Sequence, residues 1–175
     1  MNLTTRVGFS TSKSSWISKI IRWFTRSKVS HTFLIYYDQD FSRDMVMEAT
    51  EGGFRIVPFD QYTKGADYLR VFMPRQSIDY GVLIAVDWLG QHYDYAGLIG
   101  MMWVMLCRWF KRKVHNPLHS SGTMFCSTAV TMVLQAAKYI NTEKFDPAST
   151  NPEDLEEFCI VNMDEMVSLR VGSRG

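Results

Sequence analysis

Three strand-like segments joined by tight turns run from Ser30 to Pro58, and they constrain the fold more than any other part of the chain. Each is rich in the aromatic and branched side chains that favour strands, and polar or glycine-containing turns separate them. The segments are residues 30–37, 45–49 and 54–57. Turns this short cannot hold a crossover connection, so neighbouring strands should pair antiparallel. We therefore expect an antiparallel sheet.

Further elements on either side extend this sheet into an α+β fold. Strand patterns lie at 6–10 and at 68–72, the latter expected to pair with the strand before it, and the tail from Phe158 to Val171 offers another. Apolar residues suited to helices occupy several more segments: residues 16–24, 77–90, 95–110 and 124–139. A short helix should begin after Asn151, with Pro152 at its first position. The number of strand patterns predicts a sheet of about four to six strands, which is a normal size.

Length and composition favour one globular domain that spans residues 1–175. The chain has 46% hydrophobic and 21% charged residues, as is typical of a folded protein with a core. Its formal net charge is +1, so it lacks the basic excess of a nucleic-acid-binding domain, and we expect no nucleic acid partner. The three cysteines are widely spaced and form neither a disulfide framework nor a metal-binding knuckle, which fits a reducing compartment.

The most apolar stretch of the chain extends from Tyr95 to Phe110 and is uncharged until Arg108. A bilayer-spanning helix needs about 20 apolar residues, so this stretch is short for that role. The simpler interpretation is a buried helix. The alternative is a helix at a membrane surface, in which residues 96–113 contact lipid and the basic end meets acidic head groups.

Cys126 lies at the expected first turn of the apolar helix 124–139. The preceding loop, residues 120–123, offers hydroxyl groups that could cap the helix. A thiol at a helix N-terminus experiences the positive end of the dipole, which favours the thiolate. Cys126 is therefore a candidate nucleophile, and an inert core cysteine is the alternative. We interpret Cys107 and Cys159 as structural.

A cysteine nucleophile also needs an imidazole and a polar group that orients the imidazole. His31 opens one predicted strand, and Glu48 lies on the next. If the two strands pair, Glu48 can accept a hydrogen bond from His31, and the start of the cysteine helix must pack at the same edge. The alternatives are a histidine at a strand end with a satisfied hydrogen bond and a surface acid on an edge strand.

The order of these motifs resembles the circularly permuted papain-like group of the NlpC-type cysteine peptidase superfamily. The resemblance covers roughly Arg6 to Leu155. Its motifs are Ser30-His31, Glu48-Ala49, Phe125-Cys126-Ser127, the helix 16–24, Tyr93-Asp94-Tyr95 with Gly97, and residues 151–155. Two features depart from the family pattern. Thr128 stands where relatives often carry an acidic residue, and the apolar stretch around 95–118 looks like an enlarged insertion.

The resemblance implies a permuted papain-like fold, with an antiparallel sheet and the nucleophile helix packed against it. Cys126 would be the nucleophile, His31 the base and Glu48 the orienting group. The backbone N–H of Cys126 would bind the oxyanion, with the Tyr93 hydroxyl as a second candidate for oxyanion or substrate binding. The implied function is a thiol hydrolase that cleaves amide bonds, in cell-wall peptides, through an acyl-enzyme. The alternatives are a lipid acyl hydrolase or acyltransferase at a membrane surface, and a non-catalytic binding module of the same fold.

We expect no cofactor and no metal. His92, His115 and His119 lack partners at metal-ligand spacing, and Pro117 interrupts the only close pair. The N-terminus lacks the apolar core of a signal peptide, so we expect synthesis and residence in the cytoplasm. Phage origin, or delivery to the cell envelope by other means, fits equally well.

Overall fold

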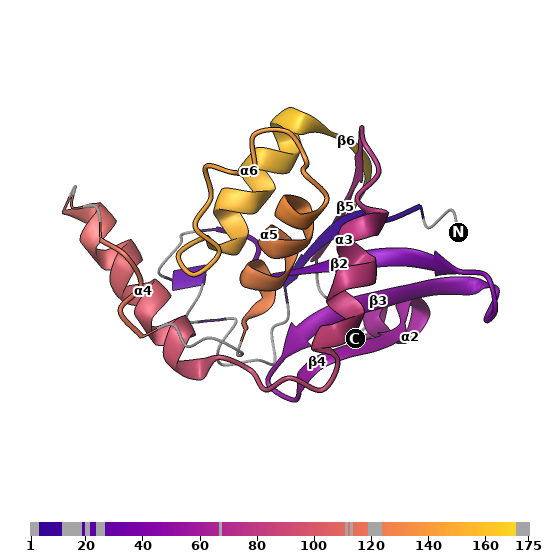
Figure 1. The fold of residues 1–175 in the computed structure, drawn as a ribbon, viewed down its shortest axis with the longest axis horizontal. Coiled ribbons are helices and arrows are strands. Elements are labelled where there is room, and N and C mark those ends of the chain that lie inside the picture. Colours follow the sequence, from indigo (N-terminus) through magenta and orange to yellow (C-terminus); the bar gives the residue numbers. More distant parts are fainter. Residues whose placement is uncertain are drawn as a thin grey trace.

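The computed structural model of the chain describes residues 4–11, 19, 22–23, 27–66, 68–110, 112, 114–118 and 124–170. The helix expected at 16–24 lies largely outside the described residues, and the loop 120–123 lies wholly outside them. The described part is an α+β fold in which helices lie against one antiparallel sheet (Figure 1). The predicted fold class is confirmed at this level.

Six strands of the described residues form the sheet in the order β4-β3-β2-β1-β5-β6, and all neighbours are antiparallel. The strands are β1 (Arg6–Thr11), β2 (His31–Asp38), β3 (Arg43–Thr50), β4 (Gly53–Pro58), β5 (Tyr68–Pro74) and β6 (Met163–Arg170). The meander β2-β3-β4 matches the prediction. The expected pairing of β5 with the preceding strand was wrong, because β5 pairs with β1 and β6. The short helix α2 (Phe59–Thr63) follows β4 directly, so this connection is a crossover and not a hairpin.

Each face of the sheet packs its own apolar cluster, because side chains alternate along strands. The larger cluster joins Val7, Phe9 and Leu34 to the helices α3 (Asp79–Ala85), α5 (Cys126–Ala136) and α6 (Pro152–Asn162). The smaller cluster joins Phe33 and its strand neighbours to α2. The segment expected as one helix at 77–90 is α3 followed by a 3₁₀ helix, η1 (Val86–Trp88).

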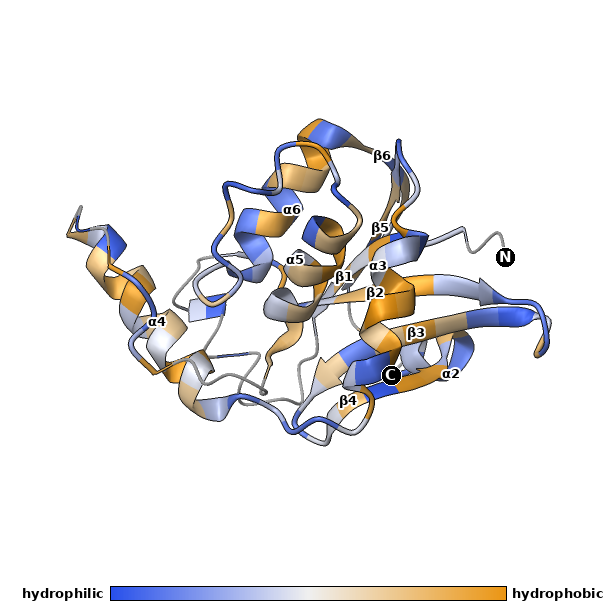
Figure 2. Ribbon diagram, viewed as in Figure 1, coloured by the Kyte–Doolittle hydropathy of each residue, from blue (hydrophilic) through white to orange (hydrophobic). Residues whose placement is uncertain are grey.

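The apolar stretch forms the helix α4 (Tyr95–Trp109), which extends away from the other helices (Figure 1) and is coloured as largely hydrophobic in Figure 2. One side of α4 is buried and includes Leu98, Met101 and Met105. The other side is exposed, so the interpretation as a buried helix holds for one side of α4 only. Among the described residues, no helix has the length and apolarity needed to cross a membrane.

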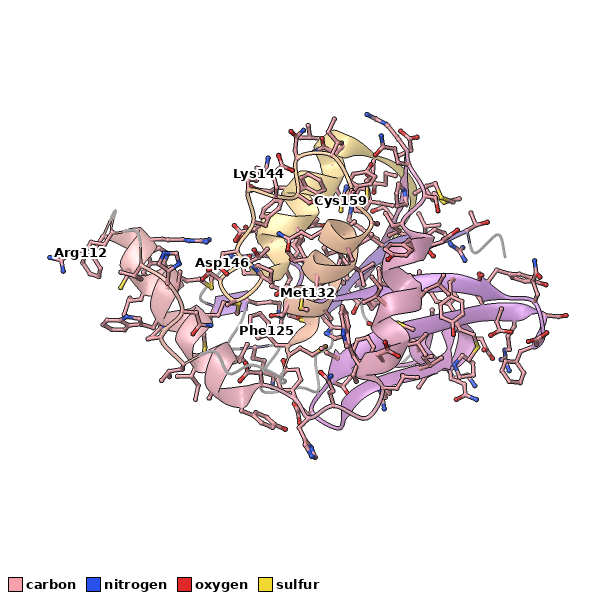
Figure 3. The ribbon with its side chains drawn as sticks, in the orientation of Figure 1. Arg112, Phe125, Met132, Lys144, Asp146 and Cys159 are labelled. Atoms are coloured by element: carbon pink, nitrogen blue, oxygen red, sulfur yellow. The ribbon has the colours of Figure 1, made fainter. Side chains whose placement is uncertain are left out.

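The helix α5 begins at Cys126, and its N-cap residue is Phe125, which makes no side-chain cap bond. The hydroxyl groups expected to cap this helix belong to residues 120–123, which lie outside the described residues, and the N-cap position itself is taken by Phe125. Phe125 is extended and fully buried against Leu98, Met101 and Met105 of α4, and Figure 3 shows it at the start of α5. Packing of this ring against α4 holds the extended residue that directly precedes Cys126.

The predicted start of α6 is confirmed. The Asn151 side chain accepts hydrogen bonds from the amides of Glu153 and Asp154, and Asp154 bonds back to the amide of Asn151 in a capping box. The Ser127 hydroxyl of α5 donates to the carbonyl of Thr150 at 2.7 Å, so the starts of α5 and α6 are joined. The tail after α6 adds the strand β6, as the sequence suggested.

Candidate active site

His31 and Glu48 meet near the start of β2. In the register of β2 and β3, Leu34 lies opposite Met47, so Glu48 is diagonally across from His31 on the same face. Nε2 of His31 and Oε2 of Glu48 are 2.8 Å apart. This hydrogen bond orients the imidazole and leaves the other ring nitrogen, Nδ1, for a second partner.

Cys126 supplies that second partner. It is the first residue of α5, which packs against β2. The thiol hydrogen-bonds the His31 side chain, and the backbone amides of Thr32 and Ser127 donate to the sulfur. The imidazole therefore lies between the thiol and the carboxylate and is bonded to both.

The positive charge of His31 and the negative charges of Cys126 and Glu48 stabilise one another. Burial raises the pKa of the Cys126 thiol, but the contact with His31 and the amide donors outweigh burial and lower it below its ordinary value. Burial lowers the pKa of His31, and the Cys126 thiolate and Glu48 reverse that effect and raise it to about 10. Burial also opposes ionisation of Glu48, yet its contacts with His31 and Arg55 lower its pKa. At a pH between the thiol and imidazole pKa values, the pair is a thiolate and an imidazolium.

Arg55 is a member of the site that our sequence reasoning missed. It lies opposite Glu48 on β4, and its Nε and Nη2 atoms are 3.0 and 2.8 Å from Oε1 of Glu48. The Glu48 side chain is only 2% exposed, so the guanidinium compensates a buried negative charge. The tight turn at Glu51 and Gly52 determines this pairing. The register that the turn imposes puts Glu48 opposite Arg55, so the sequence could have identified Arg55.

Tyr62 is the second residue that we missed. Its ring stacks on His31 with centroids 6.5 Å apart, and its hydroxyl is 2.5 Å from Oγ of Ser10 on β1. Burial raises the pKa of Tyr62 well above its ordinary value, so the hydroxyl stays protonated. Because α2 has only five residues, no helical periodicity in the sequence marked this residue.

A pocket of about 640 Å³ opens beside His31 and Glu48. Arg55, Tyr62 and Tyr93 also line it. Most other lining side chains are polar, and they include Ser10, Thr11, Ser30, Thr50, Glu51 and Gln61. Cys126 is 2% exposed and is not among the described residues that form the wall, so its link to the pocket runs through His31.

Tyr93 lies between the pocket and the start of α5. It forms a parallel bridge with Met124, and the amide of Asp94 donates to the carbonyl of Met124 at 3.0 Å. Burial, followed by the charge of Cys126, raises the pKa of Tyr93 well above its ordinary value, so its hydroxyl remains a donor. Tyr93, the predicted candidate for oxyanion or substrate binding, therefore lies close enough to Cys126 to interact with the charge on the thiol.

Cys107, Cys159 and His115 lie outside this site. Cys107 and Cys159 are buried in α4 and α6, and Cys159 is labelled in Figure 3. Burial raises the pKa of the Cys159 thiol. His115 is exposed and lies 3.6 Å from a carboxylate oxygen of Asp146, and His119 falls outside the described residues. The arrangement agrees with a structural interpretation of the two cysteines.

Comparison with known proteins links the chain to a fold. No protein-family model matches it. No curated protein matches it. Among solved structures, it is similar to a protein described as metalloprotein yiiX from Escherichia coli O157:H7, DUF1105, with 22% identity and a TM-score of 0.58. The match covers 94% of this chain and 88% of that chain. At this identity the similarity shows a common fold and carries no statement about activity.

The description of that neighbour as a metalloprotein calls for a test of the residues in this chain. Within the described ranges, no group of three or more His, Cys, Asp or Glu residues could hold a metal ion. His31 uses one ring nitrogen on Glu48, and Glu48 uses its other oxygen on Arg55. Cys126, His31 and Glu48 bond to one another in a row, and their donor atoms do not converge on a common point. These residues therefore do not fit a metal site.

Proposed function

We propose that the chain is a thiol-dependent hydrolase that cleaves amide bonds in peptides through an acyl-enzyme. The observation that carries this proposal is the continuous hydrogen-bonded row from Cys126 through His31 to Glu48. These groups supply the nucleophile, base and orienting group that such a reaction requires. The same row supports a permuted papain-like fold of the NlpC type, with residues 95–118 as an insertion.

The reaction would proceed in two halves. The Cys126 thiolate attacks the carbonyl carbon of the amide, and a tetrahedral intermediate forms. His31 gives its Nδ1 proton to the leaving amine as the C–N bond breaks, and the acyl group stays on sulfur as a thioester. A water molecule then loses a proton to neutral His31 as its oxygen attacks the thioester, and the thiolate leaves. Glu48 holds the ring in place and stabilises its charged form.

Two donors are candidates for binding the oxyanion of the intermediate. The backbone N–H of Cys126 belongs to the first turn of α5, where an amide has no partner within the helix. The Tyr93 hydroxyl is the second candidate, because Tyr93 lines the pocket, interacts with the charge of Cys126 and stays protonated.

The lining of the pocket favours a peptide as the substrate. Hydroxyl, carboxamide and charged side chains surround the exposed edge of His31, and such groups bind amides and carboxylates. Arg55 is half exposed at the pocket wall and suits a carboxylate on the substrate. Peptides of the bacterial cell wall carry both groups and are our leading substrate class.

One alternative function has an observation in its favour. A lipid acyl hydrolase or acyltransferase would work at a membrane surface, and the exposed apolar side of α4 favours that location. A fatty acyl chain, however, calls for an apolar channel beside the nucleophile, and most of the residues that line the pocket next to His31 have polar side chains. A binding module that keeps this fold without catalysis is the second alternative.

The decisive experiment incubates the protein with purified bacterial sacculi and, separately, with fatty acyl ester vesicles. We expect release of peptide fragments from sacculi, complete loss in Cys126→Ala, and no loss in the matched thiol deletion Cys107→Ala. Release of fatty acid in place of peptide would move the assignment to the lipid reaction. Absence of turnover on both, with equal and slow iodoacetamide labelling of all three cysteines, would leave only the binding module.

A further inference from the structure

The outer side of α4, together with its C-cap residue Phe110, carries exposed apolar side chains that we call the stripe. Its exposed residues are Tyr95, Ile99, Trp103, Trp109 and Phe110, all between 47% and 74% exposed. The first three repeat every four residues, so they lie on one side of the helix. The opposite side packs Leu98, Met101 and Met105 against Phe125. Figure 2 shows the hydrophobic colouring of this helix along most of its length.

Polar contacts fix the direction in which this stripe faces. Nδ2 of Asn116 donates to the carbonyls of Gly97 and Ala148 at 2.8 and 2.6 Å. A Cβ on Gly100 would lie 1.8 Å from the Asn116 side chain, so the close approach requires glycine there. Near the end of the helix, Arg108 donates to Asp154 at 2.8 Å. The helix is therefore attached along its inner side.

Positive charge gathers where the stripe ends. Arg112 is exposed and lies at the outer tip of this region (Figure 3). The sequence places Lys111 and Lys113 on either side of it. No acidic residue occurs in the sequence between Asp94 and Glu143, so the stripe and its basic end carry no negative charge of their own.

We propose that this side of α4 docks on the surface of a bilayer that contains anionic lipid. Tryptophan and tyrosine prefer the boundary between head groups and acyl chains, and adjacent basic residues are attracted by anionic head groups. The helix has 15 residues and is about 22 Å long, shorter than the hydrocarbon layer of about 30 Å, so it lies along the surface. A second copy of the chain fits less well, because stable interfaces use about 20–30 residues a side and the stripe is one helix face wide.

The stripe begins at the rim of the pocket. The Tyr95 hydroxyl donates to the carbonyl of Glu51 at 3.3 Å, and the rings of Tyr95 and Tyr93 are 5.1 Å apart. Glu51 and Tyr93 both line the pocket. Docking through α4 would therefore bring the pocket rim close to the membrane. Together with the proposed function, on which this last step rests, the substrate is a peptide held at a bilayer surface.

The test is co-sedimentation of the full chain with phosphatidylcholine vesicles, with and without phosphatidylglycerol. We expect binding only when phosphatidylglycerol is present, with affinity that falls as salt is raised. Trp103→Ser should weaken binding by about tenfold, and Arg112→Gln by about fivefold. Phe41→Ser, which removes an aromatic ring that is 69% exposed in another part of the molecule, is the matched control and should bind normally.

Circular dichroism of each variant establishes that it is folded. Equal binding by Trp103→Ser, Arg112→Gln and the parent chain would overturn the proposal, as would failure of the parent to bind anionic vesicles. A dimer in sedimentation equilibrium that Trp103→Ser dissociates would assign the stripe to a second copy instead. Cys126→Ala should bind vesicles normally, so loss of docking and loss of hydrolysis are separate results.

Discussion

Arg55 holds Glu48 through a single carboxylate oxygen. Its Nε and Nη2 atoms both lie within 3.0 Å of Oε1, at 3.0 and 2.8 Å, and Oε2 is left to His31. The carboxylate is buried while the guanidinium is half exposed. Arg55 therefore stabilises the ionised form of Glu48 from the pocket side, where a substrate can also reach it.

The substitution Arg55→Gln tests this role. Loss of the guanidinium raises the pKa of Glu48 from its lowered value, and a neutral Glu48 supports the imidazolium poorly. We expect kcat to fall by about tenfold and the acid limb of the pH–rate profile to move to higher pH. Arg55→Lys should restore the acid limb in part, because it keeps the charge without the paired donors. A pH profile identical to that of the parent would show that Arg55 acts on substrate binding alone.

Glu48→Gln preserves the shape of the side chain and removes its charge. The pKa of His31 should fall, since Glu48 is one of the groups that raise it. We expect kcat to fall by about 10²–10⁴-fold, as for other losses of acid–base support. Steady-state kinetics measure this, and Glu143→Gln, at an exposed carboxylate that does not line the pocket, is the control. Comparable losses in both variants would argue against a specific role for Glu48.

Thiol chemistry should depend on pH in a defined direction. The pKa of Cys126 is lowered, so its reaction with iodoacetamide should continue well below the pH at which ordinary thiols lose reactivity. The imidazolium that protonates the leaving group is lost as pH rises through about 10, which sets the alkaline limit of hydrolysis. In His31→Ala the alkylation profile should move to higher pH. An unchanged profile would mean that the helix start and its amides alone stabilise the thiolate.

Asn151→Ala removes the cap of α6. Two backbone amides lose their acceptor, which should lower the free energy of unfolding by about 1 kcal/mol. Thermal unfolding measures the loss. Asn151→Ser keeps an acceptor oxygen without placing a second carboxylate beside Asp154, and it should retain most of the stability. If both variants unfold at the same temperature as the parent, the capping box contributes little.

Much of the architecture follows from local signals that the sequence carries. Tight turns at 38–44 and 51–53 determine the meander and put His31 and Glu48 on one face, because strand pairing and side-chain alternation are set over a few residues. The cap at Asn151 and the following Pro152 define the start of α6 in the same local way. Cys126 could be placed in the first turn of an apolar helix from the pattern of apolar residues, although that pattern put the helix start at residue 124 and α5 begins at Cys126.

Long-range packing decided the rest. Three features depend on which surfaces meet in three dimensions. They are the pairing of β5 with β1, the burial of Phe125 at the start of α5, and the exposure of one side of α4. The same is true of the contact between Cys126 and His31, which are brought together by the packing of α5 on β2. The sequence by itself determined the elements and their chemistry. Only the tertiary structure decided their neighbours, because burial of apolar surface acts between segments that are distant in the chain.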